Sequence, residues 1–425
     1  MTSVWSDSVK DSRPQFPALS GKITADVLII GGGMAGILTA HKLKEAGANC
    51  IIAEGKGIGN GITKNTTAKI TAQHGLIYAD LIKRFGAEKA RLHYDANTLA
   101  IKQFAELSKT HLCDFEEQTA YVYSCDDHKK LEREAKACQK LGIESSFKES
   151  PPLPVKTVGA LGIKNQAQFN PLKLLTSLSA GLEVYENSFI YKLDDNIDAK
   201  HIILTTHFPL VNIPGLYFLK LYQHRSYVIA VEGADPIDGM YVDEQKNGHS
   251  FRMYKNLLFI GGGDHKTGKK GKCFMELREL ARHYPNAVER YSWATQDCMS
   301  LDGIPYIGQH RRGKSNLYVA TGFNKWGMTS SMVAAELLRD LIVYGKSELE
   351  DLYSPQRSIF RPQLALNALN AAIGLLSIGR PRCAHMGCKL HFNKLEGTWD
   401  CGCHGSRFNK DGSVIDNPAK RPIRM

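Results

Sequence analysis

Apolar runs of strand length alternate with helix-like spacing near the start of the chain. Val27–Ile30 is an apolar run typical of a buried strand, and the following ILTAHKLKEAG has the apolar spacing of a helix that ends at Gly47. A second strand-like run, ANCIIAE, ends at Glu54. Strand, helix and strand in this order predict an α/β fold that begins with a Rossmann-like domain.

Three glycines lie between the first predicted strand and the helix, in the spacing Gly31-x-Gly33-x-x-Gly36. Gly31 permits a tight turn, Gly33 lets the backbone approach a pyrophosphate, and Gly36 allows the helix to pack on the strand. Glu54 ends the second strand, where its carboxylate can accept hydrogen bonds from a ribose. A glycine turn without a ligand is the alternative, but the full context predicts dinucleotide binding by Gly31, Gly33, Met34, Ala35, Gly36 and Glu54.

A second glycine turn lies far along the chain. Leu317–Thr329 reads LYVATGFNKWGMT and precedes the helical run SSMVAAELLRDLI, so amides at a helix N-terminus can face a second anionic cofactor segment. Two such elements fit a long dinucleotide, and the predicted cofactor is FAD. Gly263-x4-Gly268-Lys269 resembles a phosphate loop, but Lys270 stands where a magnesium-binding hydroxyl is needed, which argues against nucleotide hydrolysis.

The segments between the two glycine turns predict an α+β substrate domain. Lys129–Leu141 has the periodicity of an amphipathic surface helix, whereas Ser226–Gly233 and His249–Gly263 have strand character and predict a mixed sheet over the flavin. The FAD-binding domain is therefore expected to be discontinuous. The expected boundaries are an N-terminal extension at 1–22, FAD-binding parts at 23–75, 155–212 and 300–344, substrate parts at 76–154 and 213–299, a linker helix within 354–381 and a cluster-binding region at 382–425.

Two cysteine–histidine pairs lie near the end of the chain. CAHMGC supplies Cys383 and His385, and WDCGCHGSRF supplies Cys401 and His404. Two thiolates for one iron and two imidazoles for the other make the ligand division of a Rieske [2Fe-2S] centre. Zinc is the alternative metal, although zinc modules usually show C-x2-C and H-x3–5-H spacings. The sequence therefore predicts an iron–sulfur cluster in this region.

Two further cysteines, Cys388 and Cys403, occupy equivalent places in the two loops, which favours a disulfide between them. The other six cysteines outside the loops are scattered without regular spacing. With no leading apolar segment, this usage is typical of reduced thiols and predicts a cytoplasmic protein. A disulfide is unusual in that setting.

Composition bounds the remaining possibilities. The chain has 425 residues, of which 43% are hydrophobic and 23% charged, enough for a large core and two or three domains. The net charge is +11, but the basic residues are dispersed and no nucleic-acid motif accompanies them, so no nucleic-acid partner is expected. Leu364–Gly379 is the longest weakly apolar run. It is too short to span a bilayer, so it predicts a linker helix and no transmembrane segment is expected.

Several stretches resemble the D-amino-acid oxidase and glycine oxidase superfamily of FAD enzymes, in particular the bacterial branch that carries a C-terminal Rieske domain. The stretches are GGGMAG, TTAKITAQHG, NQAQFNPLKLL, LTTHFP, GGGDHKTG and ATGFNKWGMTSS. The resemblance implies hydride transfer to flavin from a carbon that bears an amine or hydroxyl. It also implies further cofactor contacts at Thr66, Thr67, Gly322, Trp326, Gly327, Met328 and Thr329.

The same resemblance suggests three catalytic residues. Arg252 in HSFRMY matches the arginine that pairs with the substrate carboxylate in glycine-oxidase relatives, a role suited to its planar fork. A surface salt bridge is the alternative role for it. His74 and His265 lie inside family-like stretches and are candidates beside the flavin, although hydrogen-bonded structural histidines are common. Lys325 precedes the second helix and is expected near the flavin ring.

The two C-terminal loops resemble the cluster-binding boxes of the Rieske family, and GSVIDNPAKRP resembles its proline loop. The region departs from the family pattern in two ways. Gly402 stands where proline is usual, and the sequence predicts no flanking strands between Ser354 and Cys383. We therefore expect a shortened Rieske region.

Together the two cofactor sites predict an enzyme. A small amine, amino-acid-like or hydroxy-acid substrate would reduce FAD, and electrons would pass singly to the Rieske centre and then to an unidentified acceptor. One alternative is a flavin oxidase that reduces oxygen and whose C-terminal loops hold no cluster. The other is a non-enzymatic sensor of flavin or thiol state, for which the Cys388 and Cys403 pair is the sequence support.

Overall fold

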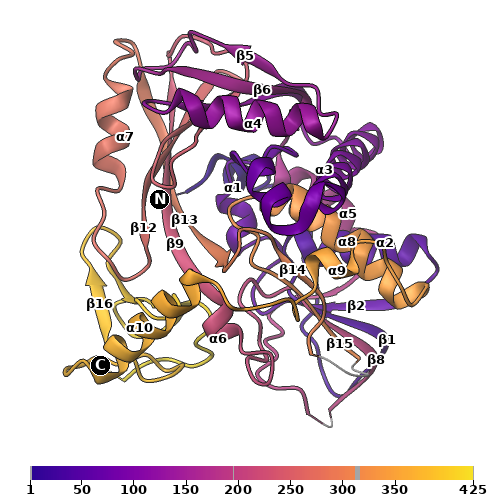
Figure 1. The fold of residues 1–425 in the computed structure, drawn as a ribbon. Coiled ribbons are helices and arrows are strands. Elements are labelled where there is room, and N and C mark those ends of the chain that lie inside the picture. Colours follow the sequence, from indigo (N-terminus) through magenta and orange to yellow (C-terminus); the bar gives the residue numbers. More distant parts are fainter. Residues whose placement is uncertain (1, 195, 312–315, 425) are drawn as a thin grey trace.

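The structure is a computed structural model that describes residues 2–194, 196–311 and 316–424 (Figure 1). Positions 1, 195, 312–315 and 425 belong to the domain ranges expected from the sequence, but they lie outside the described residues. A six-stranded sheet has the order β14-β15-β8-β1-β2-β7, in which β14 is antiparallel to β15 and the other pairs are parallel. The strands are β1 (Ile23–Ile30), β2 (Cys50–Ala53), β7 (Glu183–Tyr185), β8 (Ile197–Leu204), β14 (Tyr306–Gln309) and β15 (Leu317–Thr321).

Three helices pack together beside this sheet. They are α2 (Met34–Glu45), α5 (Pro171–Ser179) and α8 (Gly327–Val343), and α2 contacts both of the others. The predicted strand–helix–strand unit is confirmed, because β1 leads into α2 and pairs in parallel with β2. A doubly wound sheet of this kind binds ligands at the carboxyl ends of its strands, where Gly31 and Glu54 lie.

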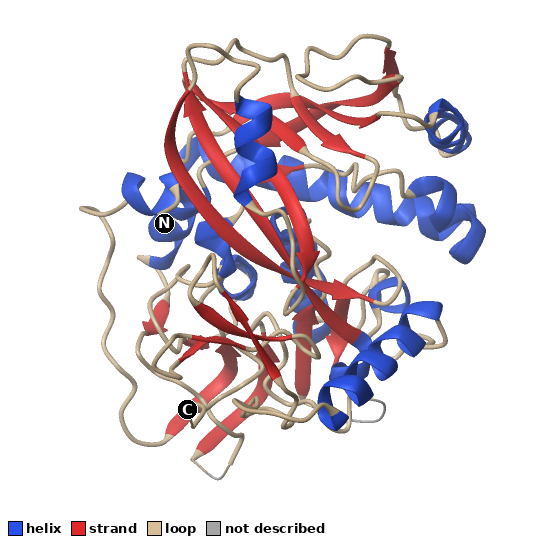
Figure 2. Ribbon diagram, turned by 90° about the vertical axis from the view of Figure 1, so that its left-hand side faces the viewer, coloured by secondary structure: helices blue, strands red, loops and turns tan. Residues whose placement is uncertain are grey.

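A second, nine-stranded sheet has the order β13-β9-β12-β11-β10-β4-β6-β3, with β5 paired to β6. It is mixed, as predicted, because β10 and β4 are parallel and its other described pairs are antiparallel. Its long strands cross the molecule (Figure 2). The strands are β3 (Lys69–Ile70), β4 (Glu116–Ser124), β5 (Ser146–Lys148), β6 (Gly159–Gln168), β9 (Leu221–Glu232), β10 (Met240–Asp243), β11 (Ser250–Tyr254), β12 (Leu257–Lys266) and β13 (Val288–Ser300).

Two strands pair differently from the expected division of the chain. The strands β3 and β6 lie in ranges assigned to the FAD-binding parts, yet both belong to the nine-stranded sheet. An apolar strand carries no local signal that says which of two sheets it joins, so the sequence could not decide this point.

The remaining helices surround the two sheets (Figure 1). The longest, α3, is interrupted at Gly86, where φ is 85°. Tyr78 at its start and Trp5 in the first helix are both fully buried, so the expected N-terminal extension is packed into the core. These elements are α1 (Val4–Ser8), the 3-10 turn η1 (Ile62–Asn65), α3 (Tyr78–Thr110), α4 (His128–Lys140), α6 (Tyr217–Lys220), α7 (Phe274–Ala281), α9 (Glu350–Tyr353) and α10 (Pro362–Leu376).

The C-terminal region has its own small antiparallel sheet in the order β16-β17-β18-β19, lying against α10 (Figure 1). The strands are β16 (Leu390–Asn393), β17 (Thr398–Cys401), β18 (Arg407–Phe408) and β19 (Val414–Asp416). No strand is described between Ser354 and Cys383, as expected, but the two predicted loops are mounted on the short strands that follow, so the expectation of loops without flanking strands is corrected. Within the described ranges, no helix is long and apolar enough to cross a membrane.

Candidate functional site

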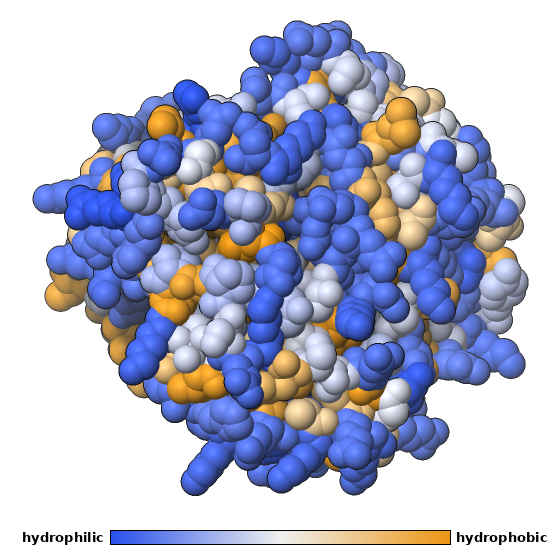
Figure 3. Space-filling view, turned by 90° about the horizontal axis from the view of Figure 1, so that it is seen from above, coloured by the Kyte–Doolittle hydropathy of each residue, from blue (hydrophilic) through white to orange (hydrophobic). Residues whose placement is uncertain are grey.

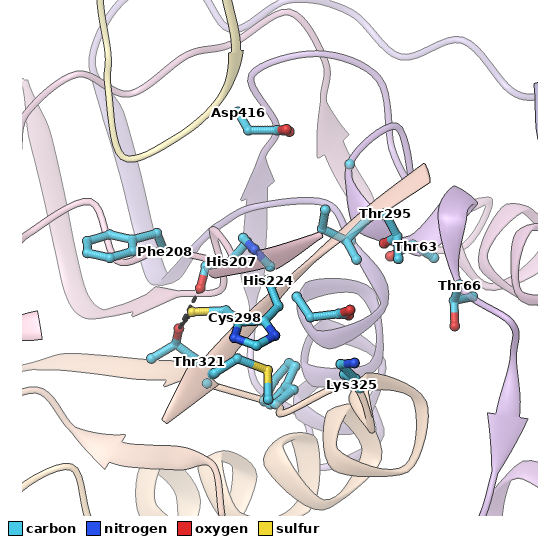
Figure 4. A pocket seen from close by; sticks show the side chains of 18 of the residues that line it. Thr63, Thr66, His207, Phe208, His224, Thr295, Cys298, Thr321, Lys325 and Asp416 are labelled. Carbon is cyan, nitrogen blue, oxygen red and sulfur yellow. Dashed lines mark hydrogen bonds between the residues drawn. The ribbon is translucent and has the colours of Figure 1, made fainter. Parts of the chain in front are cut away.

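A cavity of about 730 Å³ lies where the two large sheets and the C-terminal region meet (Figure 4). The six-stranded sheet contributes the glycine turn after β1, the residues after β8 and those after β15. The nine-stranded sheet contributes side chains of β9, β12 and β13, and the C-terminal region contributes residues 414–420 and Pro422. All three parts of the fold therefore share one binding space.

The glycine turn has the geometry of a phosphate cradle. Gly31 has φ of 116°, and a Cβ on Gly36 would lie 1.9 Å from the carbonyl oxygen of Gly31. The carboxylate of Glu54 accepts hydrogen bonds from the backbone N–H of Gly32 (2.7 Å) and of Lys56 (2.8 Å). The turn therefore leaves no room for a side chain at Gly36, and its backbone faces the cavity. This geometry fits a pyrophosphate at the N-terminus of α2.

Most of the predicted cofactor residues line this cavity. Those that do are Gly31, Gly33, Met34, Ala35, Glu54, Thr66, Thr67, Gly322, Trp326, Gly327 and Met328. The lining does not include Gly36 or Thr329. Gly36 instead packs on the carbonyl of Gly31, the packing role predicted for it, and the Thr329 hydroxyl bonds the backbone N–H and carbonyl of Thr71, each at 3.0 Å.

His74 and Lys325 also line the cavity. The His74 ring stacks on Trp326 with centroids 5.0 Å apart, and its buried Nε2 has no hydrogen-bond partner among the described residues. Burial lowers the pKa of His74 well below its ordinary value, so the imidazole is neutral. Lys325 forms an ion pair with Asp264, which is a further residue of the lining.

Arg252 is not part of the cavity lining. It is fully buried on β11, with its guanidinium over the rings of Trp5, Tyr254 and Phe259. Its Nη1 donates to Gln168, whereas Nε and Nη2 have no hydrogen-bond partner in the described part of the chain. Burial lowers the pKa of Arg252 to about 9. The predicted role as a carboxylate ligand stays a prediction.

His265 also lies outside the lining. Its Nε2 lies 3.0 Å from the hydroxyl of Tyr227, and its Nδ1 lies 3.0 Å from the carbonyl oxygen of Lys266. The Tyr227 hydroxyl donates to Glu396 at 2.9 Å. Both ring nitrogens of His265 therefore have hydrogen-bond partners, and its predicted place beside the flavin stays a prediction.

Sequence reasoning missed several titratable residues of the lining. Burial and the nearby Arg252 lower the pKa of Lys69 to about 7, burial lowers that of His224 to about 4, and burial raises that of Asp297 to about 6. Figure 4 shows His207 and His224 in the same part of the cavity. These side chains come from segments distant in sequence, and none belongs to a spaced motif that could have signalled the site.

The four predicted cluster ligands lie together at the end of the C-terminal sheet. The rings of His385 and His404 are 5.1 Å apart and perpendicular, and Cys383 and Cys401 are buried. Each Nδ1 of the two histidines is buried without a hydrogen-bond partner among the residues described. Burial lowers the pKa of both imidazoles to about 4, which keeps them in the neutral form that binds metal. Two thiols and two unpartnered imidazole nitrogens fit a Rieske cluster.

The predicted disulfide is not formed in the structure, where all ten cysteines are free. The sulfur atoms of Cys388 and Cys403 lie within 4.8 Å of each other and of Cys401. Three neighbouring thiols leave the pairing undecided, so the Cys388–Cys403 disulfide stays a prediction.

The C-terminal region is joined to the cavity wall through buried contacts. The Phe208 ring lines the cavity and lies 6.0 Å from the ring of His385 and 6.5 Å from that of His404. Asn417 donates hydrogen bonds to the carbonyls of Thr206 and Phe208. Phe208 therefore lies both in the cavity wall and beside the two predicted imidazole ligands.

Buried ion pairs reinforce this junction. Glu396 pairs with Arg225 of β9 and with Arg407 of β18, and Arg407 also pairs with Asp400 and Asp416, both at 3.1 Å. Asp416 itself lines the cavity. The Glu396–Arg225 pair therefore joins the cluster-binding region to the nine-stranded sheet, and Arg407 ties Glu396 to the C-terminal strands.

Comparisons with known proteins agree with both sites. Residues 26–341 match the family model of FAD dependent oxidoreductases (DAO), and residues 346–425 match that of the Rieske [2Fe-2S] domain. The chain belongs to the DAO family of FAD-dependent oxidoreductases and carries a C-terminal Rieske domain. It is an oxidoreductase whose cofactors are FAD and a [2Fe-2S] cluster.

Individual relatives share this architecture in whole or in part. The chain is 35% identical over 486 residues to the Bacillus subtilis (strain 168) protein YhfW, which is named as a Rieske 2Fe-2S iron-sulfur protein, covering 97% of this chain and 95% of the relative. It is similar in fold to glycine oxidase from Geobacillus kaustophilus, with TM-score 0.66, 19% identity and coverage of 79% of this chain and 99% of the other. L-amino acid deaminase from Proteus vulgaris gives TM-score 0.62, 16% identity and coverage of 82% and 99%.

Proposed function

We propose that the enzyme oxidises a small amine or amino-acid-like substrate, with a hydroxy acid as the chemical alternative, and that the electrons pass singly from the flavin site to the Rieske centre. When bound, FAD takes up two electrons as a hydride and a [2Fe-2S] cluster takes up one at a time. The observation that carries the proposal is the shared wall at Phe208, which lines the flavin cavity and contacts both predicted imidazole ligands.

The substrate class is supported by unpaired cations beside the cavity. Lys69 lines the cavity, and Arg252 lies close enough to lower its pKa. Arg252 is fully buried outside the cavity lining and adds positive charge behind Lys69, so Lys69 is the cation that would meet a substrate carboxylate. Glycine oxidase and L-amino acid deaminase, both similar in fold, act on amino acids by their names. An anionic amino-acid-like substrate therefore suits this end of the cavity.

The residues next to the proposed substrate site are suited to orienting the substrate and excluding water from the cavity, and not to general acid–base catalysis. His74 is held neutral by burial and is stacked on Trp326. The backbone of residues 416–420 closes the cavity from the C-terminal side. We propose that His74 orients the substrate as a neutral hydrogen-bonding group. The cytoplasm, where free amino acids are abundant, is the proposed location.

An anaerobic substrate screen tests the proposal. Purified holoenzyme is mixed with amino acids, secondary amines and hydroxy acids, and the flavin absorbance is followed. At least one class is expected to bleach the flavin, and turnover with an excess of a one-electron acceptor such as ferricyanide is expected to reduce about two acceptor molecules per substrate, with little peroxide, while the cluster is present. Stoichiometric peroxide from iron-loaded protein would favour a simple oxidase, and the absence of bleaching by every class would favour a sensor.

A further inference from the structure

The helix α10, Pro362–Leu376, has its polar and apolar faces reversed. Its polar residues point into the protein: Asn367 is buried and donates to the carbonyl of Leu219 at 3.0 Å, and Gln363 donates to Asn367. Its large apolar residues point outward, with exposed fractions between 42% and 82% for Leu366, Leu369, Ile373, Leu375 and Leu376. A surface helix normally shows the opposite pattern.

The exposed residues form one continuous face. Leu366, Leu369, Ile373 and Leu376 follow the spacing i, i+3, i+7, i+10, which places them along one side of a helix. Two large apolar residues that flank the helix are exposed as well, Phe360 at 83% and Ile378 at 90%. We call Phe360, Leu366, Leu369, Ile373, Leu376 and Ile378 the α10 face. An exposed apolar surface of this continuity marks an interaction site.

Along the sequence, the α10 face is flanked by positive charges and by no negative charge. The sequence from Ser354 to Leu395 contains no aspartate or glutamate. Arg361 precedes the helix, Arg380 and Arg382 follow it, and Lys389 binds through its backbone N–H to the carbonyl of Gly374. Across the described ranges, none of these four cations forms an ion pair with a carboxylate. Their charge is therefore available to a partner.

A neighbouring side of α10 packs directly on the cluster-binding loops. A Cβ on Gly374 would lie 2.3 Å from the sulfur of Cys403 and 3.3 Å from the Cβ of Cys388. The Cys403 thiol lies 3.7 Å from the carbonyl oxygen of Asn370. The helix therefore lies between the cluster-binding loops and the exposed α10 face (Figure 1).

We propose that the α10 face docks the enzyme onto the surface of an anionic lipid bilayer. A helix with an apolar face and flanking lysine or arginine lies in the plane of the membrane interface, where the apolar side chains enter the acyl boundary and the cations meet anionic headgroups. At 15 residues, α10 is suited to lying on a bilayer, not spanning one. The docking places the cluster-binding loops one helix away from the membrane surface.

Charge complementarity favours a bilayer over a second copy of the chain. Two copies meeting through the α10 face would bring the same unpaired arginines together, which is unfavourable. The face seen from above is mainly hydrophilic, with apolar side chains in small scattered patches (Figure 3). The apolar and cationic residues around α10 instead match an anionic interface.

Vesicle flotation with the holoenzyme tests the proposal. The vesicles contain phosphatidylglycerol mixed with phosphatidylcholine, or phosphatidylcholine alone. The test variant is L369Q/I373Q/L376Q, which changes three exposed side chains, and the matched control is L112Q, because Leu112 is 85% exposed at the end of α3. Circular dichroism and flavin content check that each variant is folded, and sedimentation velocity reports its oligomeric state.

Wild type and L112Q are expected to float with the anionic vesicles, while the triple variant partitions roughly tenfold or more less strongly. Arg380→Gln is expected to weaken flotation by a few-fold, because each basic residue near an anionic surface contributes on the order of 1 kcal/mol. No flotation of wild type, equal flotation on neutral vesicles, or equal flotation of the triple variant would overturn the proposal. A wild-type dimer that the triple variant dissociates would assign the face to a second copy and would also overturn it.

Discussion

Glu396 is predicted to hold the cluster-binding region onto the nine-stranded sheet. Its carboxylate accepts from Tyr227 at 2.9 Å and from Arg407 at 2.7 Å, and it pairs with Arg225, whose side chain is only 3% exposed. In Glu396→Gln, Arg407 keeps Asp400 and Asp416, whereas Arg225 loses its ion-pair partner. An uncompensated buried cation costs about 3–5 kcal/mol.

In Glu396→Gln, the contact between the cluster-binding region and the nine-stranded sheet is expected to open locally more often. A loss of about 3 kcal/mol corresponds to roughly a hundredfold more frequent opening, since each 1.36 kcal/mol is a factor of about ten. Hydrogen exchange followed by mass spectrometry is expected to show this increase in peptides from 383–416. Peptides from α2 and β1 are expected to change much less.

Two further variants make this prediction refutable. Glu149→Gln removes an exposed carboxylate and is expected to change stability by less than about 0.5 kcal/mol. The double variant R225M/E396Q removes the orphaned cation as well and is expected to recover part of the lost protection. If E396Q alters exchange in 383–416 by less than about threefold, or no more than E149Q does, the ion pairs do not hold the junction.

The pH dependence of the junction has a definite sign. Burial alone would raise the pKa of Glu396, but Arg225 and Arg407 outweigh it and the pKa is lowered. A lowered carboxyl pKa gives stability that is present above the ordinary glutamate range and is lost as the pH falls through the folded-state pKa. Exchange protection of 383–416 is therefore expected to fall in acid for wild type and to depend less on pH in E396Q.

Three other predictions concern the cavity and the cluster. The KM for an anionic substrate is expected to rise between about pH 6 and pH 9 as Lys69, with its pKa near 7, loses its proton, and K69M should flatten that profile; a flat wild-type profile contradicts this. Gly36→Ala places a Cβ 1.9 Å from the Gly31 carbonyl oxygen and is expected to purify with about tenfold less FAD, whereas Gly181→Ala, with its nearest neighbour at 3.7 Å, should retain it. Cys401→Ser is expected to lose iron while keeping its flavin spectrum, and retained iron would refute the ligand assignment.

The parts of the fold that were predictable are those with local signals. The strand, glycine turn and helix around Gly31–Gly36 lie within one short segment, and the two cysteine–histidine pairs are defined by spacing alone. Both could be recognised before any tertiary contact was known. The helix α10 was also predicted as a helix, from the weakly apolar run Leu364–Gly379.

The parts that were not predictable depend on long-range packing. The reversed orientation of α10 depends on the hydrogen bond that Asn367 donates to the carbonyl of Leu219, and these two residues are far apart in sequence. The burial of Arg252 beneath Trp5 likewise depends on the N-terminal helix folding back over β11. The C-terminal strands are only two to four residues long, too short for periodicity to reveal them.

The central claim is that substrate electrons reach the Rieske centre. The most direct measurement is low-temperature electron paramagnetic resonance on iron-loaded enzyme frozen after anaerobic reduction by one equivalent of a substrate that bleaches the flavin. The account predicts a Rieske-type signal whose intensity is a substantial share of that obtained with dithionite. Bleached flavin without a cluster signal, in protein that gives the signal with dithionite, would contradict it.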